Sequence, residues 1–317
     1  MTRALALFAI LVGEASAKTD PLDALALVPV EEVTATSTLP GKKKEPDRYA
    51  PWRVLQPRKV DTGCEDAPRV PLTAWCEGKA DEGIGEAITI KLGEPRPLKQ
   101  VEVAAGWWST AKLFRANNRP TRIGLETDAG HKLTQAVSTK KRAWVRFALD
   151  GKPVSTVTLR ILAVDQGRIN DSCISEVRLD GGGALVAPGS IAAAAKLRPF
   201  VRAVSQALAK KRQALKTMLL YPFRYEHPDG TGEVSTFAGF KEVHDCKSDE
   251  GAPSCPGGGY DDEHEAIAFA EEPGRLALSF FGNGERRDLW HLVFRDGDWR
   301  LSAIDSELTG SGDPGCE

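Results

Sequence analysis

Apolar and polar residues alternate through the first half of the chain. The alternation is clear in five stretches, at residues 87–92, 122–126, 143–149, 157–161 and 174–179. A period of two is that of a β-strand with one face in a core and the other toward solvent. Gly, Pro, Asn and Asp separate the stretches, and no helical spacing occurs between residues 70 and 180. Short strands joined by such turns predict an antiparallel β-sandwich or barrel.

The pattern changes after a Gly/Pro-rich linker at residues 181–190. Apolar residues then recur at helical spacing at Phe200, Val201, Val204, Leu208, Leu215, Met218 and Leu219. We expect Ser190 to cap this helix and Pro199 to lie in its first turn. Strand patterns return at residues 232–240, 275–281, 289–294 and 299–304. Asp296-Gly297 between the last two is a hairpin signal. One helix followed by a sheet predicts a small α+β domain.

The first residues have the features of a secretion signal. Arg3 precedes an apolar run at residues 4–12, and Ala15-Ser16-Ala17 is a small-residue cleavage site. We expect cleavage near Ala17 and a soluble periplasmic or secreted protein. No later apolar run is long enough to span a membrane. The expected organisation is a signal peptide (1–17), a leader (18–32), the sandwich (33–180), the linker (181–190), the α+β domain (191–308) and a tail (309–317).

Export changes the interpretation of the cysteines, because an oxidising compartment favours disulfides over metal sites. The chain has six, at Cys64, Cys76, Cys173, Cys246, Cys255 and Cys316. Cys246 and Cys255 flank a Gly/Pro-rich loop and are expected to pair. Cys76 has two possible partners, Cys64 and Cys173, and the sequence leaves both open. A pair between Cys64 and Cys316 would resolve the odd number in each half.

Six short motifs in the first domain resemble one family. They are residues 35–40, 73–78, 83–86, 106–107, 117–120 and 171–176. In this order they are similar to the discoidin-like (coagulation factor C-type) module attached to secreted bacterial NAD glycohydrolases. The resemblance covers about residues 33–180 and implies a jelly-roll sandwich of the galactose-binding, discoidin-like type that binds glycans or surfaces. The chain departs from the pattern at Ala105, where Asn is common, and at Asp165, where an aromatic residue is usual.

The resemblance implies no catalysis, since nothing in the chain resembles the glycohydrolase catalytic domain. The second domain is more faintly similar to the nuclear-transport-factor-two superfamily, through its helix and its final Trp290-to-Leu301 hairpin. That superfamily has a cone-like fold of one helix region packed into a curved sheet. The fold hosts enzymes, binding proteins and dimerisation modules alike, so it does not specify a function.

Aromatic and polar residues of the first domain are the candidates for contacts with sugar. The aromatic ones are Trp75, Trp107 and Trp108, and the polar ones are Asn117, Asn118, Arg119, Asp171 and Glu176. Indole rings cover the apolar face of a sugar, and polar groups bind its hydroxyls. The alternative is structural: Trp75 belongs to the core, and Arg119 pairs with Glu176. Trp107 and Trp108 are adjacent, so in a strand they point to opposite faces and one is expected to be exposed.

The net charge of -2 conceals an uneven distribution. Residues 97–225 carry 22 Lys and Arg against 8 Asp and Glu, whereas residues 226–317 carry 7 against 21. Two basic runs stand out, residues 140–142 beside Trp144 and residues 210–212. Such runs attract acidic polymers, although a solvated turn is the simpler interpretation. Their sign also suggests docking onto the acidic C-terminal third.

Other motifs do not assemble a catalytic or metal site. The acidic cluster at 261–265 is no EF-hand and reads as a solvated loop, and His244 beside the disulfide candidate Cys246 is not a convincing nucleophile pair. We therefore predict a non-enzymatic exported protein that binds carbohydrate or cell-surface glycan, without cofactor, metal or nucleic acid. The alternatives are an envelope adaptor that binds a protein, or an enzyme whose pocket in the α+β domain uses His227 or His291 with a carboxylate.

Overall fold

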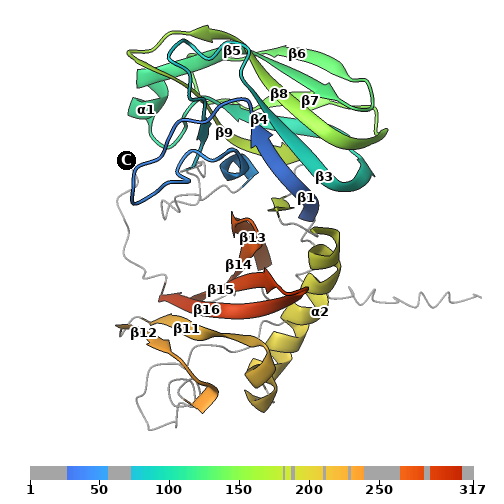
Figure 1. The fold of residues 1–317 in the computed structure, drawn as a ribbon, viewed down its shortest axis with the longest axis vertical. Coiled ribbons are helices and arrows are strands. Elements are labelled where there is room, and N and C mark those ends of the chain that lie inside the picture. Colours follow the sequence, from blue (N-terminus) through green and yellow to red (C-terminus); the bar gives the residue numbers. More distant parts are fainter. Residues whose placement is uncertain are drawn as a thin grey trace, which may run out of the picture.

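The computed structural model describes residues 27–55, 73–180, 183–186, 190–209, 212–227, 230–238, 265–281 and 286–308. Within them the chain forms a β-sandwich and a separate six-stranded sheet with one long helix, each with its own hydrophobic core (Figure 1). The prediction of a mainly β protein with a β-sandwich is confirmed. The expected signal peptide and tail lie outside the described residues.

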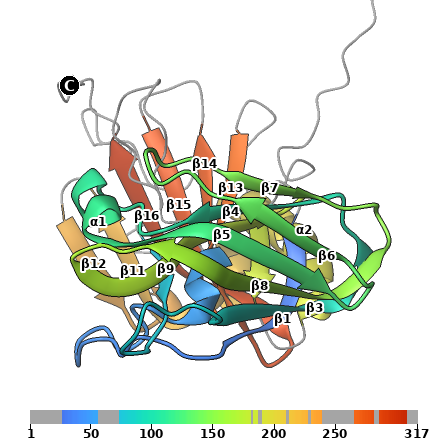
Figure 2. The ribbon, with the colours of Figure 1, turned by 90° about the horizontal axis from the view of Figure 1, so that it is seen from above.

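The sandwich has two layers of strands (Figure 2). In order across the sheet, the first layer contains β10 (Gly183–Val186), β1 (Leu27–Ala35), β3 (Ala87–Pro97), β8 (Pro153–Asp165) and β5 (Asn117–Thr127), with β6 (Lys132–Ala136) also paired to β5. The second contains β9 (Ile169–Leu179), β4 (Gln100–Ala105) and β7 (Val145–Ala148), with β2 (Trp75–Cys76) paired to β9. A short parallel pairing of β5 with β9 joins the layers.

Alternate residues of both layers fill the space between them. From the first layer come Ile88, Ile90, Ile123, Leu125, Leu159 and Ile161, and from the second Val101, Val103, Val145, Phe147 and Leu179. All are buried. A short helix, α1 (Ala111–Ala116), covers part of the outer face of the second layer, and a 3-10 helix, η2 (Pro51–Leu55), buries Val54 and Leu55. The two-residue period therefore placed the core positions correctly.

Two of the expected boundaries are wrong. β1 begins at Leu27, inside the segment expected to be a leader, and β10 lies inside the expected linker. These strands pair in parallel, from Leu27 opposite Gly183 to Val30 opposite Val186. Both segments are short and lack a clear period, so neither is recognisable as a strand alone. Pairing gives each a partner for its backbone hydrogen bonds.

In the described residues of the second domain, the long helix packs on a six-stranded sheet. The helix α2 (Ser190–Ala209) is followed by η3 (Arg212–Thr217), and the strands are β11 (Leu219–His227), β12 (Gly230–Val234), β13 (Glu265–Glu272), β14 (Arg275–Phe281), β15 (Arg286–Arg295) and β16 (Asp298–Leu308). Their order in the sheet is β12-β11-β16-β15-β14-β13, and only β11 and β16 pair in parallel. The resemblance to the nuclear-transport-factor-two superfamily stays a prediction.

The helix extends further upstream than the sequence pattern indicated. Pro199 lies inside α2 and not in its first turn. The reason is the alanine run at 192–195, which favours helix strongly enough to precede a proline that removes a backbone hydrogen bond. The α2 face toward the sheet packs against Trp290, Leu292 and Trp299, among other buried residues.

The two domains are in direct contact. Gly274 N, in the turn between β13 and β14, donates a 2.8 Å hydrogen bond to Val186 O of β10. Ser190, at the start of α2, is buried against Gly93 of β3, where an added Cβ would lie 2.4 Å from Ser190 Oγ. The strand β10 thus belongs to the sandwich sheet and also contacts the second domain.

Candidate functional site

Several loops meet at one end of the sandwich, which we call the loop end: residues 77–86 together with the turn between β8 and β9. Side chains connect them. Ser172 Oγ donates to Glu82 O at 2.6 Å, Asn170 Nδ2 to Ala80 O at 2.8 Å, and Arg160 Nη1 to Gly85 O at 2.5 Å. Loops that are distant in sequence are therefore held to each other and to the strands, as a preformed binding surface requires.

A disulfide stabilises this end. Cys76 of β2 is bonded to Cys173 of β9, which confirms one of the two alternatives for Cys76. Trp107 packs against the pair, together with the partly buried Tyr49. The other disulfide candidates, Cys64, Cys246 and Cys255, lie outside the described residues, as does Cys316.

Glu77, next to the disulfide, is a buried carboxylate that the sequence gave no reason to single out. Its oxygens accept hydrogen bonds from the backbone N–H groups of Lys79 at 2.6 Å and Ser172 at 3.2 Å. Burial raises the pKa of the Glu77 carboxyl, and these two hydrogen bonds act in the opposite direction. The side chain ties the 77–86 loop to β9. The sequence feature that could have indicated this role is the position of Glu77 directly after Cys76.

All three candidate tryptophans are buried. Trp75, Trp107 and Trp108 expose 0%, 9% and 6% of their surface, so the expectation that Trp107 or Trp108 is exposed is wrong. The pair follows β4 and does not continue it, because Gly106 turns the chain with a φ of 92°. Trp107 then packs on the disulfide, and Trp108 packs with Phe114 of α1. Trp75 is a core residue, as the structural alternative predicted.

The two candidate asparagines are also buried and position neighbouring segments. Asn117 Nδ2 donates to Leu113 O at 2.8 Å and so closes the end of α1. Asn118 Oδ1 accepts from Gly167 N at 3.0 Å, and its Nδ2 donates to Asn170 Oδ1 at 2.9 Å. The Asn118 amide therefore holds the turn between β8 and β9 against β5, beneath the surface of the loop end.

Arg119 has a different partner from the expected one. Its Nη2 lies 2.7 Å from Asp165 Oδ2, while Glu176 Oε1 accepts from Arg178 Nε at 2.7 Å. The register explains this, since β5 and β8 place Arg119 opposite Asp165, whereas Glu176 stands on β9 opposite Ala104. The predicted pair of Arg119 with Glu176 is therefore wrong.

Arg119, Asp165 and Asp171 are among the polar side chains that remain accessible at the loop end. Arg119 and Asp165 expose 20% and 47% of their side chains. Asp171 is half-buried, and its burial raises the pKa of the carboxyl. Glu176 is buried under Arg178 and is not accessible. Of the candidate polar residues, Arg119 and Asp171 are thus accessible at the surface. Asp165, which the sequence marked only as a departure from the family pattern, is accessible as well.

An aromatic contact near the loop end was also missed. The Tyr49 ring lies edge-on to Trp107 with 5.6 Å between ring centroids, and the Arg48 guanidinium is 5.7 Å from the Tyr49 centroid. These residues precede η2, in a segment whose composition indicates only an irregular loop. No periodicity marks it, so sequence reasoning had no signal to use.

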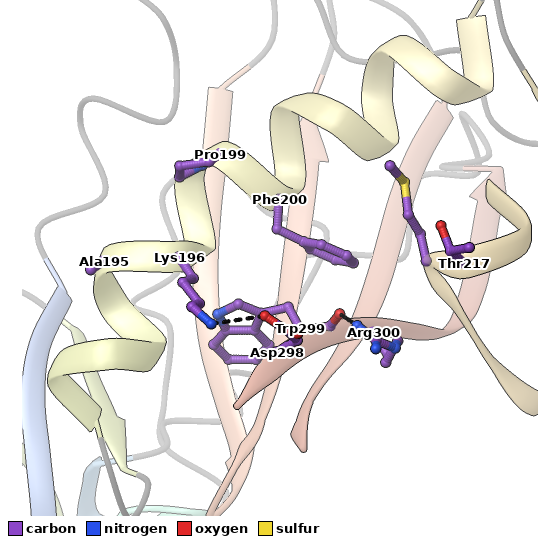
Figure 3. A pocket seen from close by; sticks show the side chains of 9 residues that line it. Ala195, Lys196, Pro199, Phe200, Thr217, Asp298, Trp299 and Arg300 are labelled. Carbon is purple, nitrogen blue, oxygen red and sulfur yellow. Dashed lines mark hydrogen bonds and ion pairs between the residues drawn. The ribbon is translucent and has the colours of Figure 1, made fainter. Parts of the chain in front are cut away.

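The second domain has a groove on the side of α2, shown in Figure 3. Its volume is about 590 Å³, and it is lined by Ala195, Lys196, Pro199, Phe200, Thr217, Met218, Asp298, Trp299 and Arg300. Lys196 Nζ lies 2.9 Å from Asp298 Oδ1, and this contact lowers the pKa of Asp298. The Lys196 ammonium is therefore already engaged by a carboxylate.

The alternative of an enzyme with a cone-shaped pocket is not supported. Apolar side chains, including Phe223, Trp290 and Trp299, fill the space between α2 and the sheet. His291 is buried and does not line the groove. The His227 side chain, the His244 and Cys246 motif and residues 261–264 of the acidic cluster are outside the description.

The part of the chain that the structure describes has neither a metal-binding cluster nor a helix that could span a membrane. Among those residues, no group of three or more His, Cys, Asp or Glu side chains is placed to hold a metal ion. No helix among them has the length and apolarity needed to cross a membrane.

Comparison with known proteins finds a family similarity in the sandwich. Residues 69–180 match the model of the family described as the NAD glycohydrolase translocation F5/8 type C domain. This confirms the resemblance that the six motifs predicted. No curated protein matches the chain.

Solved structures with similarity to the chain include carbohydrate-binding modules. The family 32 module of C. perfringens NanJ, in complex with galactose, is 12% identical over 47% of this chain and 91% of that one, with a TM-score of 0.31. The Streptococcus pyogenes NAD+-glycohydrolase translocation domain is 18% identical over 31% and 89%, with a TM-score of 0.27. The mycobacterial arabinofuranosyltransferase AftD is 17% identical over 47% of this chain, with a TM-score of 0.33. This chain covers 10% of the AftD chain.

Proposed function

We propose that this is an exported, non-enzymatic protein whose N-terminal β-sandwich binds carbohydrate on a cell or envelope surface through its loop end. The family match of residues 69–180 supports a translocation or glycan-binding role for the sandwich. The observation that carries the proposal is the accessible Arg119–Asp165 pair at that end. Export rests on the signal-like sequence at residues 1–17.

The chemistry of the pair suits sugar hydroxyls. A hydroxyl both donates and accepts a hydrogen bond, and the pair offers guanidinium donors beside carboxylate acceptors, with 2.7 Å between Arg119 Nη2 and Asp165 Oδ2. Asp171 adds a half-buried carboxyl. It directly follows Asn170, whose side-chain amide is held by a hydrogen bond from Asn118. Polar groups held in place before binding lose little entropy when the ligand arrives.

The experiment measures binding of the full chain to an array of neutral mono- and oligosaccharides. The test variant is Arg119→Gln/Asp165→Asn, which removes both charges and leaves neither partner alone. Asp150→Asn/Lys152→Gln is the matched control, because this exposed pair is also separated by 2.7 Å but lies in the turn between β7 and β8, at the opposite end of the sandwich.

We expect the wild type and the control to bind the same glycans, and the test variant to lose roughly tenfold or more in affinity, as for truncated charged hydrogen bonds. Equal binding by the test variant would overturn the role of the loop end. No binding by the wild type, together with co-purification of an envelope protein, would favour the adaptor alternative.

A further inference from the structure

The outer face of the second layer carries an ordered row of charges. In the register of the sheet, Glu102 of β4 stands between Arg146 of β7 and Arg178 of β9. Adjacent strands are about 4.8 Å apart, so the two arginines are anchored roughly 10 Å from each other. The alternate residues of the same strands, such as Val103 and Phe147, point into the core. This row therefore faces outward.

An indole ring lies beside this row. Trp144 directly precedes β7, and it packs against the cluster that contains Ala104 and Trp108. The Trp144 ring is edge-on to Trp108, with 5.4 Å between centroids, and the Arg178 guanidinium carbon is 4.1 Å from the Trp144 centroid. Such a contact between a cation and an aromatic face is favourable and limits the motion of both groups. We call the surface formed by Trp144 and the surrounding cations the Trp144 face; these cations are Lys140, Lys141, Arg142, Arg146 and Arg178.

The loop before β7 adds more cations. Lys140 and Lys141 are exposed. Arg142 is held in place by a 2.7 Å hydrogen bond from its Nη1 to Trp108 O. This basic run therefore includes an arginine that is fixed against the same aromatic cluster, which a merely solvated turn does not require.

The carboxylates of this face lie below its cations. Glu102 and Glu176 are buried, with Glu102 Oε1 at 2.6 Å from Arg146 Nη2 and Glu176 Oε1 at 2.7 Å from Arg178 Nε. Arg146 and Arg178 expose 66% and 29% of their side chains. The solvent-facing groups of this row are thus the two guanidiniums, and the two carboxylates lie beneath them. Each guanidinium has further N–H donors beyond the one or two that bind its glutamate.

We propose that the Trp144 face binds an acidic polysaccharide, that is, a sugar chain with carboxylate groups, at a site separate from the loop end. Arginine forks bind carboxylates in a planar, two-point geometry. The partly exposed Trp144 ring offers an apolar contact to a sugar ring between those charges. The proposal deepens the proposed carbohydrate-binding function, on which it rests, but it uses a different surface.

The observations favour a polysaccharide over nucleic acid. Glu102 and Glu176 each pair with a cation of this face, whereas the binding face of a nucleic-acid-binding domain is typically strongly basic. The cations form a local row on one sheet and its preceding loop. A binding site for a duplex would extend over several phosphates on a broad basic surface.

The test uses polygalacturonate as the acidic probe and its fully methyl-esterified form as the neutral probe, with the same backbone. Binding to the full-length protein is measured by calorimetry at low and at moderate salt. We expect polygalacturonate to bind at least about tenfold more tightly than the esterified chain, and its affinity to fall as salt screens the charges.

Two variants test the face itself. Lys140→Gln/Lys141→Gln removes two exposed charges, and Arg146→Gln/Glu102→Gln removes both members of an ion pair so that no charge is left alone. Each is expected to weaken polygalacturonate binding by roughly five- to tenfold. Lys91→Gln/Lys132→Gln is the matched control, because these lysines are exposed on the first layer, and it should change binding by less than about twofold. Unchanged thermal unfolding verifies folding of each variant.

The outcomes separate this proposal from the loop-end site. The Arg119→Gln/Asp165→Asn variant should retain polygalacturonate binding. Loss of polygalacturonate binding in this variant would overturn the proposal that the two sites are separate. Equal affinity for both probes, or an equal loss in the lysine control, would overturn the role of the Trp144 face. Tighter binding to a DNA duplex than to polygalacturonate would overturn the choice of ligand. Polygalacturonate binding without any binding of neutral glycans would reject the loop-end site and leave this proposal standing.

Discussion

Arg119 Nη2 and Asp165 Oδ2 lie 2.7 Å apart, across the end of the ladder that joins β5 to β8. Their side chains are accessible at the loop end, and the pair carries no part of the core. Because exposed ion pairs contribute little to folding, the charge of Asp165 is available for a function other than stability.

We expect Asp165→Asn to change the free energy of unfolding by less than about 1 kcal/mol. Urea denaturation of the full chain measures this change. A loss of several kcal/mol would mean that the pair supports the fold, and it would weaken the functional interpretation of the loop end.

The disulfide between Cys76 and Cys173 should contribute strongly to stability. It closes a loop with a sequence separation of 97 residues. In the chain-entropy model such a loop costs the unfolded state about 4–5 kcal/mol. Cys76→Ser/Cys173→Ser is therefore expected to unfold at lower temperature than the wild type in non-reducing buffer. The difference should shrink when both proteins are reduced, and a difference that persists unchanged would contradict a covalent origin.

The burial of Asp171 predicts a pH-dependent effect of its neutral isostere. Because its folded-state pKa is raised above the ordinary 3.8, the folded protein holds the proton more tightly than the unfolded chain does. This contribution to stability is present below the ordinary pKa and is lost as pH rises through the raised one. Asp171→Asn should therefore be more stable than the wild type near neutral pH.

Denaturation from acidic to neutral pH measures this difference, which is expected to vanish at the acidic end. The neighbouring Glu77 acts in the same direction, since the Asp171 charge also raises the pKa of Glu77. A variant that is less stable than the wild type at neutral pH would show that the Asp171 carboxylate makes a favourable contact as an ion.

The contact between the domains can be tested at Gly93. A Cβ at this position would lie 2.4 Å from Ser190 Oγ and 3.1 Å from Ile191 Cγ1. We expect Gly93→Ala to destabilise the start of α2 by about 1–3 kcal/mol, as overpacked sites do. Hydrogen exchange of the α2 amides reports this loss.

Removal of the clashing hydroxyl provides the decisive comparison. Gly93→Ala/Ser190→Ala should recover part of the lost protection. Gly124→Ala is the control, since its nearest neighbour is the end of the Leu162 side chain at 3.1 Å, which has room to move. If Gly93→Ala leaves exchange at α2 unchanged, the packing of α2 on β3 is looser than the structure indicates.

Much of the sandwich was predictable because the pattern of a few neighbouring residues is enough to indicate each strand. The alternation of Ile88 and Ile90 with polar neighbours specifies a strand and its buried face without reference to any other segment. The six motifs likewise carry the family resemblance that the match of residues 69–180 supports. The strands β1 and β10 were missed, because β10 has only four residues and β1 has no clear period, and β1 becomes a strand by pairing with both β3 and β10.

The candidate site was harder to predict. Periodicity indicates which face of a strand a residue occupies, but not what covers that face. Trp108 and Glu176 stand outside the core and are buried all the same, because α1 and Arg178 lie over them. Trp107 is buried because the turn at Gly106 directs it toward the disulfide. The two cysteines of that disulfide are 97 positions apart in sequence.

Residue types and spacing alone thus established the fold class of the first domain, the family of its motifs and a short list of polar candidates. Register and coverage, which follow from contacts between distant segments, established the rest. They paired Asp165 with Arg119, buried both Trp107 and Trp108, and placed Trp144 beside Arg178. The physical reason is that accessibility depends on the whole packed chain, whereas a sequence pattern reports only the conformation of a few neighbouring residues.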